Sequence, residues 1–214
     1  MNILIVSATK LEIASFLEEI GAGADNSVLS SNPYKSHKID VLITGVGIAQ
    51  TGFYLGKYLS KKYDLVINAG ICGSFNRNLR LGEVVNITED YFADLGAEDD
   101  EKFLSVSELS LPGAYYVKNE TLFTLENVKQ VRGVTVNTTH GSENSIKKFT
   151  SRIKADTESM EGAAFLWACN NEKVKCIQLR SVSNYVEKRD RSKWEIAKAI
   201  NSLNEILIKL ISIL

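Results

Sequence analysis

The chain has few of the residues that build metal centres, disulfide frameworks and flexible linkers. Its 214 residues include two histidines, three cysteines and two prolines. Two histidines, His37 and His140, are too few for a histidine-rich metal centre, so we expect no bound metal. Cys72, Cys169 and Cys176 are odd in number and stand at no metal-binding spacing, and no signal-peptide pattern is visible. These features predict reduced thiols and a cytoplasmic location.

Charge and hydropathy exclude two further classes of partner. The chain carries 25 basic and 26 acidic residues, a formal net charge of -1 at pH 7. This balance gives no polyanion-binding surface, so we expect no nucleic acid partner. No apolar run reaches the roughly 18 residues of a membrane span, so we expect no membrane partner. Since no repeat or linker is visible, residues 1–214 are predicted to form a single domain.

Predicted strands and helices alternate along the chain. Uninterrupted apolar runs predict buried strands at residues 2–8, 38–44, 64–69, 83–88, 133–137 and 175–182. Apolar residues at helical spacing predict helices at 13–20 and 48–59, from about 142, from 160, and at 196–214, while 93–113 is expected to be loop. This order predicts an α/β fold with a central, mostly parallel, mixed twisted sheet flanked by helices. Ligands of such folds bind at the carboxyl ends of the strands.

Residues 155–165 (Ala-Asp-Thr-Glu-Ser-Met-Glu-Gly-Ala-Ala-Phe) are the most informative segment. An acidic cluster there precedes small residues at the start of a predicted helix. An ionised carboxylate can accept two hydrogen bonds from neighbouring hydroxyls, such as the pair on a ribose. We assign that task to Glu161. For Glu158 we favour a helix N-terminal carboxylate that complements the helix dipole.

Three polar residues that follow strands are further candidates. Glu12 lies just beyond the first strand, where the alternative is a solvated helix carboxylate. Asn184 ends the last strand and offers both a donor and an acceptor, although Asn is also a common turn residue. Arg189 is either a solvated charge or a partner for an anionic substrate tail.

Two glycine-containing segments suggest chemistry that we do not favour. Residues 45–50 begin like a dinucleotide fingerprint but lack its third glycine and the acid that should follow. The alternative is a tight strand-to-helix turn whose backbone amides can face a ligand. Residues 70–74 contain Cys72, a candidate nucleophile with His140 as its base. Small residues at a strand end are better explained by the chain passing close beneath a flat ligand.

Taken in order, short motifs along nearly the whole chain resemble the nucleoside phosphorylase superfamily, specifically its nucleosidase branch. They are Ser7-Ala8 leading to Glu12, Gly45-Val46-Gly47, Asn68 to Gly73, Ser159 to Ala164, and Arg180 to Asn184. The resemblance implies a nucleoside phosphorylase-like domain that needs no cofactor and acts on a small-molecule nucleoside. It also implies a homodimer with active sites near the subunit interface, and the segment 93–113 is the candidate for reaching across.

The resemblance implies roles for individual residues. Glu12 is the general base that activates water, and Asn184 assists the departing base through a hydrogen bond. Glu161 holds the ribose hydroxyls. The remaining candidates for substrate binding are Ser7, Gly47, Gly70, Met160, Ser183 and Arg189.

Departures from the family pattern bear on the substrate. Adenosine-type nucleosidases carry Asp where this chain has Asn184. An amide can donate to O6 or N7 of a 6-oxopurine and accept from its N–H, which suits hypoxanthine. Residues 184–194 and 90–98 are similar to the futalosine hydrolases. That similarity implies cleavage of futalosine by water to hypoxanthine and dehypoxanthine futalosine, in menaquinone biosynthesis.

Three alternatives stay open at this point. The first is a methylthioadenosine/S-adenosylhomocysteine-type nucleosidase, against which Asn184 argues. The second is a phosphate-dependent purine nucleoside phosphorylase, against which the lack of arginine after the first and third strands argues. The third is a catalytically silent nucleoside-binding protein, against which the presence of both Glu12 and Glu161 argues.

Overall fold

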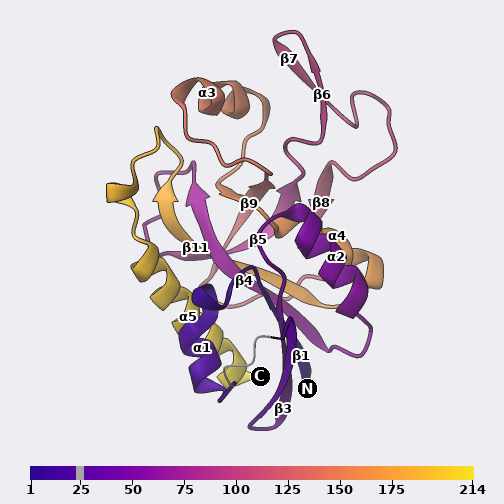
Figure 1. The fold of residues 1–214 in the computed structure, drawn as a ribbon, viewed down its shortest axis with the longest axis vertical. Helices are drawn as coiled ribbons and strands as arrows, with labels where there is room; N and C mark the ends of the chain where they lie inside the picture. The colour runs from indigo at the N-terminus through magenta and orange to yellow at the C-terminus, as the bar shows by residue number, and fades with distance from the viewer. Residues whose placement is uncertain (23–26) are drawn as a thin grey trace.

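The computed structural model describes residues 1–22 and 27–214, and a large mixed sheet runs through them (Figure 1). Its strands are β1 (Asn2–Ser7), β2 (Leu29–Tyr34), β3 (His37–Ile43), β4 (Leu65–Ser74), β5 (Val84–Tyr91), β8 (Tyr116–Lys118), β9 (Lys129–Thr135), β10 (Thr157–Ser159) and β11 (Cys176–Tyr185). Their order is β10-β9-β5-β11-β4-β1-β3-β2, and β8 pairs with β5. Strands β6 (Gly96–Asp99) and β7 (Lys102–Ser105) form a separate hairpin.

Part of the sheet closes on itself. Strand β10 pairs with β9 on one side and with β4 on the other, so β4, β11, β5, β9 and β10 form a ring. The pairs β1–β3, β1–β4, β4–β11, β5–β9 and β9–β10 are parallel. The pairs β2–β3, β4–β10, β5–β8 and β5–β11 are antiparallel. The predicted α/β class with a mostly parallel, mixed sheet is therefore confirmed.

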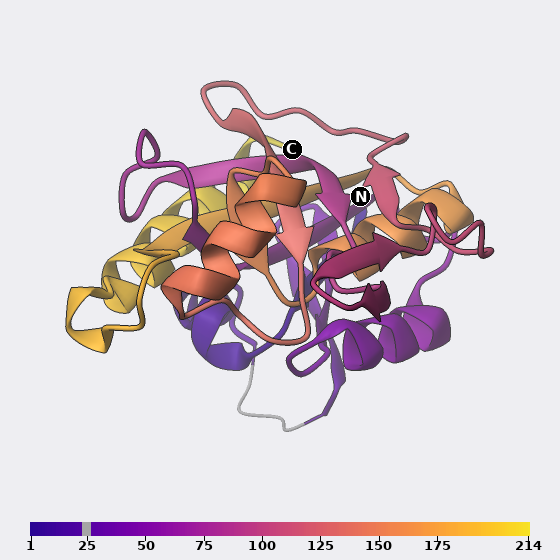
Figure 2. The same ribbon diagram turned by 90° about the horizontal axis from the view of Figure 1, so that it is seen from above.

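Helices cover both faces of the sheet. They are α1 (Ala14–Glu19), which follows the 3-10 turn η1 (Lys10–Ile13), α2 (Ile48–Tyr58), α3 (Glu143–Arg152), α4 (Gly162–Glu172) and α5 (Ile196–Ile213), which follows η2 (Arg191–Lys193). Figure 1 shows α1 and α5 on one side and α2 and α4 on the other. Seen from above in Figure 2, α3 (orange) lies across the end of the sheet. No helix among the described residues is long and apolar enough to cross a membrane.

Side-chain alternation along β1 explains these two layers. Ile3 and Ile5 pack in one apolar cluster with residues of α1 and α5, while Leu4 and Val6 pack in another with residues of α2 and α4. Successive strand side chains point to opposite faces, so a strand covered on both faces reads as a continuous apolar run. The uninterrupted runs in the sequence are strands for this reason.

Several element boundaries differ from the prediction. Strand β4 does not end at Gly70 but continues to Ser74, because residues 70–74 pair with β11 and, at their end, with β10. The segment 93–113, predicted to be loop, contains the β6–β7 hairpin. The edge strand β2 was not predicted, since it is short, polar and contains Pro33.

The helix predicted from residue 160 begins at Gly162. Glu158 therefore lies in strand β10 and not in the helix. On this helix Ala163 and Ala164 are buried, whereas Trp167 is 49% exposed.

Candidate functional site

A cavity of about 370 Å³ opens where β1, β4 and β11 reach their carboxyl ends. Six of the predicted site residues line it, namely Glu12, Met160, Glu161, Ser183, Asn184 and Arg189. The other three, Ser7, Gly47 and Gly70, are not among the lining residues. Ligands of α/β sheets bind at this edge, so the fold and the predicted residues indicate the same site.

Glu12 is held by four donors at the end of β1. Its Oε2 accepts from the backbone N and the hydroxyl of Thr9, both at 3.0 Å, and from the Ser7 hydroxyl at 3.5 Å. Its Oε1 accepts from the backbone N of Ile71 at 3.0 Å. Thr9 also caps η1, and together with Glu12 it forms a capping box. Glu12 is 9% exposed, so the solvated alternative is wrong.

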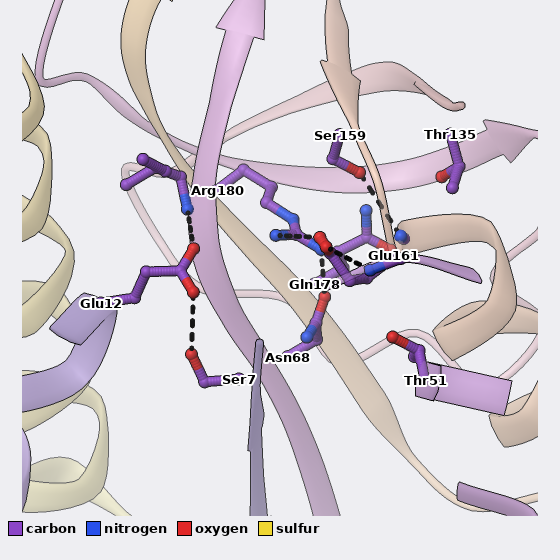
Figure 3. Close-up of polar contacts among 12 residues, drawn as sticks. Ser7, Glu12, Thr51, Asn68, Thr135, Ser159, Glu161, Gln178 and Arg180 are labelled. Carbon is purple, nitrogen blue, oxygen red and sulfur yellow. Dashed lines mark hydrogen bonds and ion pairs between the residues drawn. The ribbon is translucent and has the colours of Figure 1, made fainter. Parts of the chain in front are cut away.

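Glu161 is held at the opposite side of the cavity, at the N-cap of α4. Its Oε1 accepts from the backbone N of Gly47 at 3.1 Å, and its Oε2 lies 3.3 Å from Nη1 of Arg180. Arg180 is 1% exposed and donates from Nη2 to Asn68 Oδ1 at 2.7 Å, as Figure 3 shows. The carboxylate is therefore fixed by a buried cation and an amide, with the rest of its lone pairs available to a ligand.

Gly70 explains how both carboxylates fit against β4. It pairs with Arg180 across the β4–β11 ladder. A Cβ built at Gly70 would collide with Nη1 of Arg180 and would lie 3.0 Å from Glu12 Oε1. The glycine thus leaves room for the guanidinium and the carboxylate. Gly70 and Gly47 support these groups and do not line the cavity, and Ser7 does the same through its hydrogen bond to Glu12.

Asn184 and Ser183 lie together at the end of β11. The Ser183 hydroxyl contacts Cys72 O at 3.1 Å and Asn184 Oδ1 at 2.8 Å, while Asn184 Nδ2 donates to Tyr185 O at 3.1 Å. An irregularity in the β4–β11 register falls between Val182 and Asn184. The primary amide has a second N–H and a further lone pair, so Asn184 can still pair with a ligand in the cavity.

Arg189 is fixed at the cavity wall by its backbone and by an aromatic ring. Its backbone N donates to Gly141 O at 3.0 Å, and its guanidinium lies 4.9 Å from the ring centroid of Trp194. Both Arg189 and Trp194 line the cavity. The cation–π contact holds the guanidinium in place without neutralising its charge.

Glu158 and His140 form a pair that the sequence did not indicate. Glu158 is 4% exposed and accepts from the backbone N of His140 at 3.0 Å and from its ring nitrogen Nδ1. The prediction that Glu158 is a helix N-terminal carboxylate is therefore wrong. Burial raises the pKa of Cys72 to about 12, and His140 is bonded to Glu158, which argues against a cysteine nucleophile with a histidine base.

A buried polar cluster supports the start of α4. Asp90 is fully buried and accepts from Gln178 Nε2 and from the Thr135 hydroxyl, both at 3.0 Å. The same hydroxyl accepts from the backbone N of Ala163 at 2.8 Å. Burial raises the pKa of Asp90 to about 6, against the opposing effect of these hydrogen bonds.

The stability of the wild-type protein relative to Asp90→Asn is expected to fall as pH rises from about 4 to about 6. The folded-state pKa of about 6 lies above the ordinary value of 3.8, so the folded protein binds this proton more tightly than the unfolded chain. The stabilisation is complete below the lower value and lost above the higher one, a difference of about 3 kcal/mol. Urea unfolding of both proteins across this pH range measures the effect. A stability of wild type relative to Asp90→Asn that rises with pH would contradict the raised pKa of Asp90.

Comparison with known proteins agrees with this fold. The family model of the phosphorylase superfamily matches residues 2–212. The futalosine hydrolase of Streptomyces coelicolor is 32% identical over 188 residues, which cover 82% of this chain and 79% of that protein. The futalosine hydrolase of Thermus thermophilus is 28% identical over 218 residues, covering 98% and 95%.

Solved structures share the fold over its whole length. The native futalosine hydrolase of Helicobacter pylori superposes with a TM-score of 0.80 at 18% identity, covering 100% of this chain and 98% of that one. The 5'-methylthioadenosine/S-adenosylhomocysteine nucleosidase of the same organism gives 0.83 at 19%, covering 100% and 99%. Since the family model spans nearly the entire chain, the chain belongs to the phosphorylase superfamily.

Proposed function

We propose that this protein hydrolyses futalosine, releasing hypoxanthine and dehypoxanthine futalosine. The observation that carries the proposal is the meeting of Glu12, Glu161 and Asn184 in one cavity. Three curated relatives at 28–32% identity bear the name futalosine hydrolase, which supports this substrate. The protein is accordingly a nucleosidase, a hydrolase of N-glycosyl compounds.

Glu12 activates the attacking water. Cleavage of an N-glycosidic bond builds positive charge on the ribose, an oxocarbenium-like state. A water molecule at the anomeric carbon must lose a proton as it attacks, and the Glu12 carboxylate takes that proton. Its hydrogen bonds from Thr9 and Ile71 fix the carboxylate from both sides, so little reorganisation is needed at the moment of reaction.

Glu161 orients the sugar. Its carboxylate accepts hydrogen bonds from the ribose hydroxyls, while Arg180 and Gly47 hold it in place. Met160 lines the cavity beside it and packs beneath the ribose. The sugar is thereby fixed with its anomeric carbon toward Glu12.

Asn184 reads the purine. Its free N–H donates a hydrogen bond to O6 or N7 of the 6-oxopurine. That hydrogen bond strengthens as negative charge develops on the departing base. The Ser183 hydroxyl, 2.8 Å from Asn184 Oδ1, orients the amide. The 6-amino group of adenine is a donor and would face the N–H donor of Asn184, which disfavours methylthioadenosine as the substrate.

Water is favoured over phosphate as the nucleophile. Arg180 is engaged by Glu161 and Asn68, so it does not offer a phosphate site. The Glu12 carboxylate lines the cavity and opposes an anion there. These contacts argue against a phosphate-dependent purine nucleoside phosphorylase.

The remainder of the cavity suits an aromatic carboxylated tail. Its lining includes the apolar side chains of Leu11, Val46, Trp194 and Ile200. Arg189, held over the Trp194 ring, supplies the positive charge that pairs with the tail carboxylate.

The functional form is proposed to be a cytoplasmic homodimer that serves menaquinone biosynthesis. Phe53 on α2 and Trp167 on α4 are 65% and 49% exposed, and these two helices pack together. Large exposed apolar side chains of this kind favour a protein interface. The segment 93–113, which contains the β6–β7 hairpin, is proposed to reach across the subunit interface. The three buried free cysteines suit a reducing compartment.

Replacing Asn184 by Asp is expected to move specificity from futalosine toward methylthioadenosine. A carboxyl group can accept from the exocyclic amine of adenine, so the ratio of kcat/KM for the two nucleosides should shift by about 10²-fold or more. Base release by both proteins, read by chromatography, measures it. Asn78→Asp, on an exposed turn, is the matched control. Equal preference in wild type and Asn184→Asp would show that Asn184 does not read the purine.

A further inference from the structure

The His140–Glu158 pair lies in the cavity wall, and neither the sugar nor the attacking water needs it. Both residues line the cavity. Glu158 accepts from the backbone N of His140 through Oε1 and from Nδ1 through Oε2. Only 15% of the histidine side chain and 3% of the glutamate side chain are exposed. A buried carboxylate without a partner is strongly unfavourable, so the pair is a fixed unit.

The pair stands beside Asn184, at the purine end of the cavity. Glu158 is directly opposite Gly73 in the antiparallel β10–β4 ladder. Residues opposite each other in a ladder project to the same face of the sheet. A Cβ built on Gly73 would lie 3.4 Å from Nδ2 of Asn184, so the Asn184 amide occupies the face to which Glu158 projects.

The histidine ring is held with one nitrogen available to a ligand. Nδ1 is bonded to Glu158, and Nε2 makes no hydrogen bond to any residue that the structure describes. Phe149 and Phe75 pack against the ring, with centroid distances of 4.5 Å and 6.2 Å. A carboxylate that binds one ring nitrogen fixes the ring orientation and balances the charge of an imidazolium.

We propose that His140, oriented by Glu158, is a further catalytic residue that donates a proton from Nε2 to a ring nitrogen of the departing purine. The inference rests on the proposed nucleoside hydrolysis. Asn184 can donate a hydrogen bond to the purine but cannot transfer a proton to it, because an amide N–H does not ionise near neutral pH. His140 supplies what the amide lacks.

The proton and electron balance of the step is complete. The bond between the anomeric carbon and the purine nitrogen breaks, and its electron pair stays on the purine. Water adds to the anomeric carbon and gives one proton to Glu12, while the imidazolium gives one to the purine. Glu12 then returns its proton to solvent and His140 takes one from solvent, so the net reaction consumes only water.

This assignment predicts a bell-shaped pH dependence of kcat/KM. Glu12 must be deprotonated and His140 protonated, so the rate falls at low and at high pH. The other charged groups that face the cavity are Glu161 at the start of α4, and Glu187, Lys188 and Arg189 in the loop after β11. Glu158 is the charged group in direct contact with the ring.

The test compares wild type, His140→Gln and Glu158→Gln, with Thr138→Ala, exposed in the same loop, as the control. Each protein is assayed on two substrates. The first is the purine nucleoside that the wild type cleaves, futalosine or methylthioadenosine. The second is 4-nitrophenyl riboside, whose phenolate leaves without a proton. Both cavity variants should cleave the purine nucleoside about 10²-fold more slowly and the nitrophenyl riboside within a few-fold of wild type. His140→Gln should also lose the high-pH decline.

The first three of the following outcomes overturn the His140 proposal. An equal loss on both substrates would make the pair purely structural, and an unchanged rate would remove it from the reaction. The wild-type protein alone also tests the proposal, so the test does not depend on a variant that folds. A rate of purine release by the wild type that does not decline at high pH would contradict the proposal. Cleavage of methylthioadenosine but not futalosine refutes the proposed substrate alone, whereas cleavage of neither refutes both.

Discussion

Replacing Glu12 by glutamine is expected to lower kcat by about 10³-fold and to change KM only a few-fold. Loss of a general base removes an interaction that matters in the transition state and not in substrate binding. Glutamine keeps the size of the side chain but presents an N–H to one of the donors at Thr9 or Ile71. That mismatch should destabilise the fold by about 1–3 kcal/mol, so rates are compared at a temperature where both proteins are folded.

The control for this change is Glu18→Gln, since Glu18 is exposed on α1 and lies away from the cavity. A second measurement uses Glu12→Ala with added formate. A small carboxylate that enters the space should restore part of the rate if the missing group is a base. A loss in kcat of less than about tenfold, or no effect of formate on a folded Glu12→Ala protein, would contradict the assigned role.

Replacing Glu161 by glutamine is expected to reduce both stability and activity. Arg180 is 1% exposed, and without the Glu161 carboxylate the hydrogen-bond partner that remains for its side chain among the described residues is the neutral Asn68 amide. Breaking a buried ion pair in this way typically destabilises a protein by about 3–5 kcal/mol. The amide also holds the ribose hydroxyls less strongly, so kcat/KM should fall by about 10²-fold. Urea unfolding and nucleoside hydrolysis measure the two effects.

Two further variants separate these effects. Glu172→Gln, at the exposed far end of α4, is the matched control and should change neither property. Glu161→Gln combined with Arg180→Met removes the unpaired charge, so stability should recover while activity stays low. Recovery of activity in the double variant would show that the carboxylate does not hold the sugar.

The fold was predictable wherever a strand is covered on both faces, because such strands are continuous apolar runs. Strand β1 and the first half of β4 are examples. The rest of β4 was missed because Gly70 and Gly73 resemble a turn in sequence. In the structure they belong to a strand that pairs with β11 and β10, and the closing of that ring depends on contacts far apart in the chain.

The site was predictable for groups that directly follow strands or begin a helix. Glu12, Glu161 and Asn184 were found in this way, and all three line the cavity. Arg180 was missed although one signal was present, a lone basic residue in an apolar strand. Glu158 was placed wrongly because the helix begins at Gly162 and not at Met160. Its partnership with His140 depends on where the loop after β9 lies, which residue spacing does not encode.

The most direct test of the account is futalosine cleavage in phosphate-free buffer made with ¹⁸O-labelled water. The released base is identified by chromatography and the sugar product by its mass. We predict hypoxanthine, with one labelled oxygen at the anomeric carbon of dehypoxanthine futalosine, at a rate that added phosphate does not raise. Release that requires phosphate and yields a sugar 1-phosphate, or no release from futalosine, would contradict the account.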